Sequence, residues 1–220
     1  MGVCGAAAIL VMFCCFGSRE PLDPRDAQSP RGQQAGESSR YLETCPLAGG
    51  FVFPVGPPDA QGYYNAQPFG KNNHLGEDWN GTGGGNTDLG DPIYAIAKGI
   101  VFHAKQAGPG WGNVVRVYHN IGTGDEPRFV ESLYAHLDTL DVSEADIVAK
   151  GQRLGTMGNV DGRYYAHLHL EVRTRIGMPI GGGYSSDTEG FVEPTEFIRS
   201  RRNINRDANH SLQGTANRRP

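Results

Sequence analysis

The stretch Ala166-His167-Leu168-His169-Leu170-Glu171-Val172-Arg173 decides the fold, because its apolar and polar side chains alternate without a break. A period of two is typical of a β-strand, in which successive side chains point to opposite faces. The leucines and the valine then face a core, while the polar set must meet solvent, a metal ion or polar partners. His167 and His169 lie on this polar face roughly 7 Å apart. That spacing allows one imidazole to bind a metal while the other flanks it.

Short runs of β-branched and aromatic residues recur through the chain, separated by turn signals. The predicted strands are residues 51–55, 93–97, 99–104, 113–119, 129–137 and 166–173. Residues 141–149 predict one short helical turn, and no long amphipathic helix is expected. The 32 glycines and 14 prolines follow no Gly-X-Y period, which favours a turn-rich β protein over collagen. The sequence therefore predicts an all-β fold built from antiparallel strands.

The run 129–137 contains a third candidate histidine. If this run is a regular strand, Ser132, Tyr134 and His136 share one face. The other face, carrying Leu133, Ala135 and Leu137, is then expected to point to the core.

The string His74-Leu75-Gly76-Glu77-Asp78 adds an imidazole and a carboxylate. Its glycine and the neighbouring asparagines favour a turn that leads into a strand, a geometry in which the side chains of His74 and Asp78 converge. Two imidazoles and one carboxylate, with water in the fourth position, form a common catalytic zinc site. Further histidines beside such a metal are suited to proton transfer. The pattern therefore indicates a zinc hydrolase.

The remaining polar candidates have simpler interpretations. His103, His119 and His210 are expected to be surface residues or satisfied core residues. Glu77 is expected to face solvent. Glu171 is either an acceptor that orients a ligand imidazole or a solvated charge. The aromatic residues that could border the site, or equally pack in the core, are Trp79, Trp111, Tyr164 and Tyr165.

Three strings in this order resemble the lysostaphin-type zinc endopeptidases of bacterial cell walls: His-x-Gly-x-Asp at 74–78, Tyr-x-His-Leu at 134–137 and His-Leu-His-x-Glu at 167–171. The resemblance runs from about Gly50 to Ile198. It includes Asp91-Pro92-Ile93-Tyr94-Ala95, Lys150-Gly151-Gln152-x-Leu154-Gly155 and the closing Glu193-Pro194-x-x-Phe197-Ile198.

The resemblance implies a compact domain of packed antiparallel sheets with the site in an open groove. It implies a zinc ion (Zn2+) held by His74, Asp78 and His169, with His136 and His167 as catalytic histidines. The implied reaction is hydrolysis of peptide bonds in stem or cross-bridge peptides of peptidoglycan by metal-activated water. The chain has no His-Glu-x-x-His string, so histidines must replace the glutamate base of that other protease class. The loop 159–166 departs from the usual family pattern, so substrate preference is not carried over.

Two other functions fit the same residues. One is a wall-binding or hydrolase-activating module without catalysis of its own, although this chain retains all the implied ligands and both flanking histidines. The other is a zinc peptidase that acts on a peptide outside the wall. Measuring the zinc content distinguishes the non-catalytic module from an enzyme. Analysis of the products formed on purified wall distinguishes a wall peptidase from one that acts on another peptide.

Both ends of the chain differ from its middle. Residues 1–17 are largely apolar and predict an export signal, with lipidation at Cys14 or Cys15 as an alternative that would anchor the chain to a membrane. Residues 18–46 predict a disordered linker, 47–199 the peptidase domain and 200–220 a disordered basic tail. The expected location is the periplasm, the cell envelope or the outside of the cell.

Bulk composition excludes some classes of partner. A formal net charge of -4 gives no electrostatic reason to bind nucleic acid. Three of the four cysteines lie in the apolar N-terminal stretch, so no disulfide framework is expected in the body of the protein. The chain is expected to be a monomer that binds peptidoglycan peptides.

Overall fold

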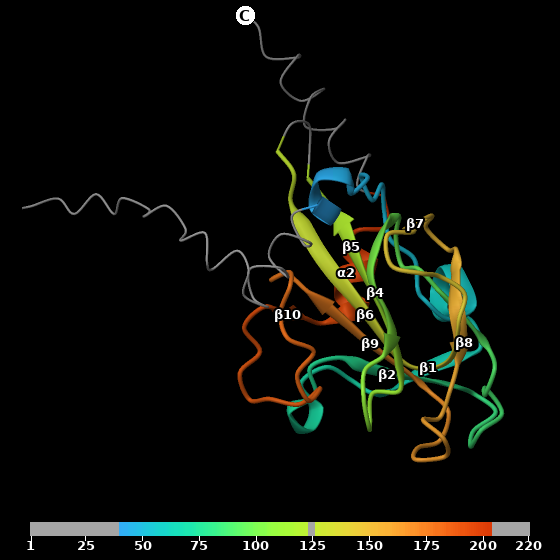
Figure 1. Ribbon diagram of the computed structural model, residues 1–220. Coiled ribbons are helices and arrows are strands. Elements are labelled where there is room, and N and C mark those ends of the chain that lie inside the picture. The colour runs from blue at the N-terminus through green and yellow to red at the C-terminus, as the bar shows by residue number, and fades with distance from the viewer. Residues whose placement is uncertain (1–39, 123–125, 204–220) are drawn as a thin grey trace, which may run out of the picture. The chain divides into compact units, whose positions relative to one another are not determined.

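Ten antiparallel strands connect into one hydrogen-bonded sheet in the computed structural model, which describes residues 40–122 and 126–203 (Figure 1). The strands are β1 (Tyr63–Gln67), β2 (Glu77–Gly81), β3 (Pro92–Tyr94), β4 (Gly99–Gln106), β5 (Asn113–Asn120), β6 (Phe129–Leu140), β7 (Ile147–Val148), β8 (Arg153–Met157), β9 (Leu168–Arg173) and β10 (Phe191–Val192). The helical segments are η2 (Gly56–Ala60), η3 (Lys71–Asn73), α2 (Pro194–Ser200) and residues 40–44. The predicted all-β fold is confirmed.

The long strand β6 organises the sheet. The main strand order is β1-β2-β9-β6-β5-β4-β7, with β10 beside β9 and β8 pairing with both β6 and β3. Strand β6 pairs with β5 and β9 along most of its length and with β8 near its end. In Figure 1 it runs diagonally across the centre of the molecule. The strand β9 is therefore held between β6 on one side and β2 on the other, away from the edges of the sheet.

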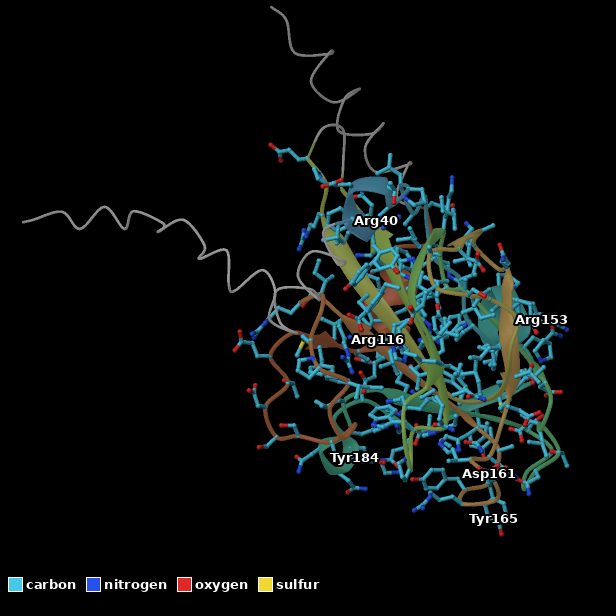
Figure 2. The ribbon with its side chains drawn as sticks, viewed as in Figure 1. Arg40, Arg116, Arg153, Asp161, Tyr165 and Tyr184 are labelled. Carbon is cyan, nitrogen blue, oxygen red and sulfur yellow. The ribbon has the colours of Figure 1, made fainter. Side chains whose placement is uncertain are left out.

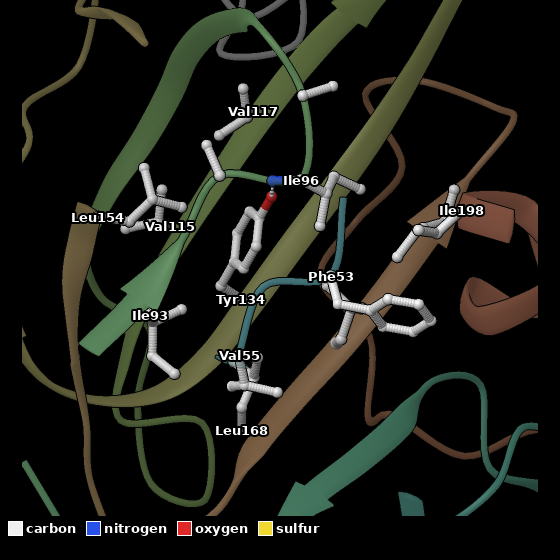
Figure 3. Close-up of a cluster of buried hydrophobic side chains, with 14 of the residues drawn as sticks. Phe53, Val55, Ile93, Ile96, Val115, Val117, Tyr134, Leu154, Leu168 and Ile198 are labelled. Carbon is white, nitrogen blue, oxygen red and sulfur yellow. Dashed lines mark hydrogen bonds between the residues drawn. The ribbon is translucent and has the colours of Figure 1, made fainter. Parts of the chain in front are cut away.

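One face of the sheet packs on the main hydrophobic core (Figure 3). Leu168, Leu170 and Val172 of β9 are all buried there, as their alternation predicts. Figure 3 also shows Tyr134 in this core, where its hydroxyl oxygen accepts a hydrogen bond of 2.8 Å from the Ile96 backbone N–H. The polar end of a buried tyrosine is thereby satisfied.

Residues 51–55 do not form the predicted strand, although their apolar side chains lie in the core. Phe51, Phe53 and Val55 are buried, but the backbone finds its partners in separate segments. Phe51 N–H donates to Arg201 O, Val52 N–H donates to Ile96 O, and Pro54 O accepts from Tyr94 N–H. With partners scattered in this way, the segment satisfies its buried peptide groups without entering a ladder.

The expected face assignment within β6 is also wrong. Tyr134 lies opposite Leu170 and Ser132 opposite Val172, so both belong to the main core face. Leu133 and Ala135 lie on the second face, in a smaller apolar cluster. The Ser132 hydroxyl lies 2.7 Å from Nε2 of buried His119 and 3.0 Å from the Tyr134 hydroxyl. Polar side chains are tolerated on this core face because they bond to one another.

Several boundaries differ from the predicted ones. The short helix predicted in residues 141–149 is replaced by a turn and by β7. Helix α2 was not predicted. It begins with Pro194, a residue suited to the first helical turn, and it buries Phe197 and Ile198.

Residues 40–46, expected to belong to the disordered linker, are part of the folded domain. Residues 40–44 are helical, and buried Cys45 packs with Ile100 and Tyr118. Burial raises the pKa of the Cys45 thiol to about 11. The predicted export signal, the rest of the linker and the tail beyond residue 203 lie outside the described residues. Within the described part of the chain, no helix has the length and apolar character needed to cross a membrane.

Candidate metal centre

Three side chains bring their ligand atoms together where β2 meets β9. Asp78 and His169 lie opposite each other in the register of these strands, and Oδ1 of Asp78 is 3.0 Å from Nδ1 of His169. His74 precedes β2, after the turn η3, as its sequence predicts. Its Nε2 lies 3.0 Å from His169 Nδ1 and 3.4 Å from Asp78 Oδ1. The three atoms form a nearly equilateral triangle.

The size of this triangle fits a tetrahedral zinc ion. Bonds of about 2.0–2.2 Å to nitrogen and oxygen place neighbouring ligand atoms about 3.3–3.6 Å apart. The observed separations of 3.0–3.4 Å are close to this range. Two imidazoles and one carboxylate also form a donor set that zinc takes in catalytic sites. The residues present therefore fit the metal that the sequence implies.

Gly76 allows the first motif to approach β9. A Cβ atom at this position would lie 2.5 Å from Leu170 O and 2.9 Å from His169 Cε1. Those distances are far shorter than van der Waals contact, so any side chain here would push β2 away from β9. The glycine of His-x-Gly-x-Asp is thus required by the close approach of the two ligand-bearing segments.

Each ligand imidazole is oriented by its second nitrogen. His74 Nδ1 lies 3.2 Å from Gln67 O, a carbonyl that accepts a hydrogen bond from its N–H. His169 Nε2 lies 3.0 Å from Oε1 of Glu171. Glu171 is fully buried, so the alternative of a solvated charge does not describe it. These bonds leave His74 Nε2 and His169 Nδ1 as the nitrogens that face Asp78.

The carboxylates also shape the charge of the site. Burial by itself favours neutral groups here, but hydrogen bonds between opposite charges outweigh it. The pKa of His169 is raised to about 9, since bonds to Asp78 and Glu171 overcome the effect of burial. The pKa of Asp78 is lowered, because hydrogen bonds from His169 and His74 overcome its desolvation. The site therefore favours a charged carboxylate, the form that binds a cation.

A β-bulge delivers His136 to this site. Asn113 pairs with Leu137 and Val115 pairs with Tyr134, so β6 has one more residue than β5 between these pairs. His136 has a φ of 64°, in the left-handed region that non-glycine residues rarely adopt. Ala135 already faces the His169 side of the sheet. The extra residue turns His136 to the same side, instead of into the core.

His136 and His167 both leave Nε2 unused by the protein backbone. The Trp111 carbonyl lies 3.2 Å from Nδ1 of His136, and the Tyr165 carbonyl lies 2.8 Å from Nδ1 of His167. The two ring centroids are 4.7 Å apart. His167 Nε2 is 3.9 Å from Asp78 Oδ1. Burial, together with the neighbouring histidines, lowers the pKa of His136 to about 3, so its ring is neutral.

The histidines line an open groove with a volume of about 630 Å3. Trp111, Tyr164 and Tyr184 contribute aromatic surface, and residues 181–183 contribute a run of glycines. Residues 160–163 line an adjoining hollow that shares Pro109 with the groove, consistent with the expectation that loop 159–166 borders the site. Figure 2 shows Tyr184 and Asp161 at the same end of the molecule.

Two residues beside the site motifs lie away from the groove. Trp79, for which groove lining and core packing were both expected possibilities, packs in the core against Phe53. Glu77 is fully buried rather than solvent-facing, and its carboxylate accepts hydrogen bonds from Trp79 and Thr195. Tyr184 and the glycine run were missed, because they contact the site only through a long loop between β9 and β10. The available signal was the run of three glycines followed by an aromatic residue, Tyr184.

Peptidase family M23 matches residues 73–181, a segment that contains the site residues His74, Asp78, His136, His167, His169 and Glu171. Lipoprotein NlpD of Yersinia enterocolitica is 39% identical over 84 residues, which are 38% of this chain and 78% of that protein. Murein hydrolase activator NlpD of Escherichia coli is also 39% identical over 84 residues, but these are only 20% of its length. The catalytic domain of the antimicrobial peptidase lysostaphin from Staphylococcus simulans is 21% identical, with a TM-score of 0.43, over 73% of this chain and 96% of that domain.

Proposed function

The chain belongs to Peptidase family M23, and from this premise we propose that it is a zinc-dependent endopeptidase acting on the peptides of peptidoglycan. One observation carries the proposal. The triangle of His74, Asp78 and His169 has the dimensions of a zinc site, and two more histidines direct free ring nitrogens toward the same groove. A site built only to hold a structural metal needs no such pair.

In this proposal His74, Asp78 and His169 hold the metal. Zinc, when bound, supplies Lewis-acid polarisation of a peptide carbonyl and a water whose pKa is lowered to about 7. Glu171 keeps His169 in the orientation that presents Nδ1 to the metal. The backbone carbonyl of Gln67 does the same for His74.

His136 and His167 together supply proton transfer. A neutral imidazole with Nδ1–H bonded to a carbonyl accepts a proton at Nε2, and the protonated form donates it again. One of the pair accepts the proton of the attacking water. The other, in its protonated form, donates an Nε2–H hydrogen bond to the oxygen of the tetrahedral intermediate, where negative charge develops.

The groove suits an extended peptide. It is open at the surface, and glycines at 110 and 181–183 leave the protein backbone accessible along its walls. We assign peptidoglycan peptides as substrate because a similar protein is named for activating murein hydrolases. The predicted export signal and the lipoprotein relative support a location in the cell envelope.

A second function has its own support. The Escherichia coli relative is named a murein hydrolase activator, so this chain is an alternative candidate for an activator that cuts nothing itself. The two functions differ in what they require of His136 and His167, since an activator has no need of a proton-transfer pair beside the metal.

Incubation of the full chain with purified peptidoglycan, followed by mass spectrometry of the released fragments, tests the proposal. We expect fragments with new amino and carboxyl termini within the peptide, formed at a much lower rate by the His136→Ala variant. A zinc-loaded protein that cuts no bond, yet raises the rate at which a separate amidase solubilises the wall, would establish the activator function instead. Cleavage of unrelated unfolded proteins but not of wall would redirect the substrate assignment.

A further inference from the structure

The second face of the sheet carries a buried arginine whose donors are all engaged. Arg173 lies on β9 and is fully buried. Its Nε donates to Oε2 of Glu171 over 2.7 Å, and its Nη2 lies 2.5 Å from the same oxygen. Nη2 also donates to Ile180 O over 2.8 Å, while Nη1 donates to Pro179 O over 3.0 Å and to Met178 O over 3.5 Å. A guanidinium has five N–H donors, and this arrangement uses every one.

The acceptors belong to two different parts of the protein. Glu171 bonds through its other oxygen to His169, one of the proposed metal ligands. The three carbonyls belong to the loop between β9 and β10, the large orange loop in Figure 1. Three successive carbonyls of this loop therefore turn inward onto a single side chain.

The same loop continues directly into a wall of the groove. Gly181 O accepts a hydrogen bond of 3.0 Å from the Trp111 indole, and Gly183 O accepts one of 2.9 Å from Leu75 N–H. The ring of Tyr184 lies 5.0 Å from that of His74. A shift of residues 178–180 would thus move surfaces that line the site.

We propose that Arg173 is a positioning residue that fixes the metal ligand His169 and the groove wall 178–184 relative to each other. This inference rests on the proposed function, because it assigns His169 to the metal. The planar fork of arginine reaches a carboxylate on one side and carbonyls on the other, whereas the point charge of lysine cannot span both.

Arg116 provides a matched control on the same face. Its Nη2 donates to Met178 O over 2.7 Å, and its Nε donates to Glu131 over 2.7 Å. It is thus a second arginine that holds the loop, and it is nearly buried. Among the hydrogen bonds and ion pairs of the described residues, none joins Arg116 to Glu171. Glu131 Oε1, which Arg116 binds, also lies 3.7 Å from Arg173 Nη1, and a lysine at position 116 keeps a positive charge beside it. Arg116→Lys should therefore loosen the loop while the bonds of Arg173 and His169 to Glu171 hold the orientation of His169.

The test compares full-length Arg173→Lys with Arg116→Lys by two measurements. Zinc affinity, measured by competition with a chelator, should fall about 10- to 100-fold in Arg173→Lys, the scale seen when groups supporting a ligand are lost. It should stay at the wild-type value in Arg116→Lys. Hydrogen exchange of the amides in 178–184 should accelerate in both variants. Activity should show a raised KM in both and a lowered kcat only in Arg173→Lys.

Each outcome bears on the inference. A folded Arg173→Lys protein with wild-type zinc affinity would overturn it, as would unchanged exchange in the loop. If Arg173→Lys does not fold, Glu171→Gln takes its place. His169 and Arg173 bind different oxygens of Glu171, and glutamine replaces one of these oxygens by an NH2 donor, so one of the two bonds is lost. Unchanged zinc affinity in that variant would equally overturn the link. If the wild-type protein neither binds zinc nor cleaves the wall, the proposed function fails instead. Hydrogen exchange of residues 178–184 would still show whether Arg173 holds this loop.

Discussion

Asp78 and His169 occupy directly opposed positions on β2 and β9, and their ligand atoms lie 3.0 Å apart. The geometry of the candidate metal centre is therefore set by the register of these two strands. A slip of one residue between these strands would turn one of the two side chains to the other face. The buried alternation of β9, with Leu168 and Leu170 in the core, fixes that register and so fixes the site.

Removal of a proposed ligand should abolish both metal binding and hydrolysis. We expect His169→Ala to lose zinc, since two ligands hold the metal weakly and without defined geometry. Metal analysis of the purified protein measures the stoichiometry. His103→Ala, which changes a histidine on β4 outside the site, should retain one zinc ion per chain. Stoichiometric zinc and normal activity in His169→Ala would contradict the ligand assignment.

The flanking histidines should separate catalysis from metal binding. His136→Ala and His167→Ala should keep zinc and lose activity by roughly 10²-fold or more, the effect of a missing general base or oxyanion donor. Zinc content and kcat on wall fragments are measured on the same preparations. If either variant loses its metal, that residue belongs among the ligands.

Gly76→Ala should destabilise the fold through steric overlap. The added methyl would lie 2.5 Å from Leu170 O, and overpacking of this kind costs about 1–3 kcal/mol. Denaturant unfolding gives the free energy of unfolding. Gly182→Ala is the control, because a Cβ there meets no atom within 4 Å. Equal stability of the two variants would show that β2 moves aside without cost.

Buried His119 should make the fold sensitive to acid. Desolvation lowers its pKa from 6.5 to about 4 in the folded protein. The unfolded chain therefore takes up this proton first as the pH falls, and stability should drop between pH 6.5 and about 4. The full contribution of this group is roughly 3 kcal/mol. His119→Gln should flatten that part of the stability curve, and an identical pH profile in the variant would exclude His119 as the cause.

Residues 40–46 should contribute to stability more than to chemistry. A chain that starts at residue 47 loses Cys45 and the partly buried Tyr41 and Leu42, which pack against Ile100 and Tyr118. Apolar burial on this scale contributes on the order of 2 kcal/mol. A chain that starts at residue 40 is the control. We expect a lower Tm for the shorter protein, with kcat unchanged. Equal Tm values would show that residues 40–46 behave as part of the linker and do not stabilise the domain.

The sequence predicts the parts of this molecule that depend on local alternation. Strand β9, with one apolar and one polar face, follows directly from residues 168–173, and the turn before β2 follows from Gly76 and the asparagines. The bulge at His136 does not, because it depends on the register of β6 against β5, whose paired residues 113–115 lie far from His136 in the sequence. The burial of Glu77 also depends on a distant partner, Thr195 of α2.

The bulge at His136 separates a proposed proton-transfer group from the strands that carry the proposed metal ligands. Deleting His136 would leave Ala135 alone opposite Val114, restore a regular ladder and leave the His74–Asp78–His169 triangle on its own strands. The product would be a folded metal-binding protein without one of its proton-transfer groups. Under the proposed function, loss of this single irregularity in backbone geometry would be enough to silence catalysis, with no redesign of the scaffold.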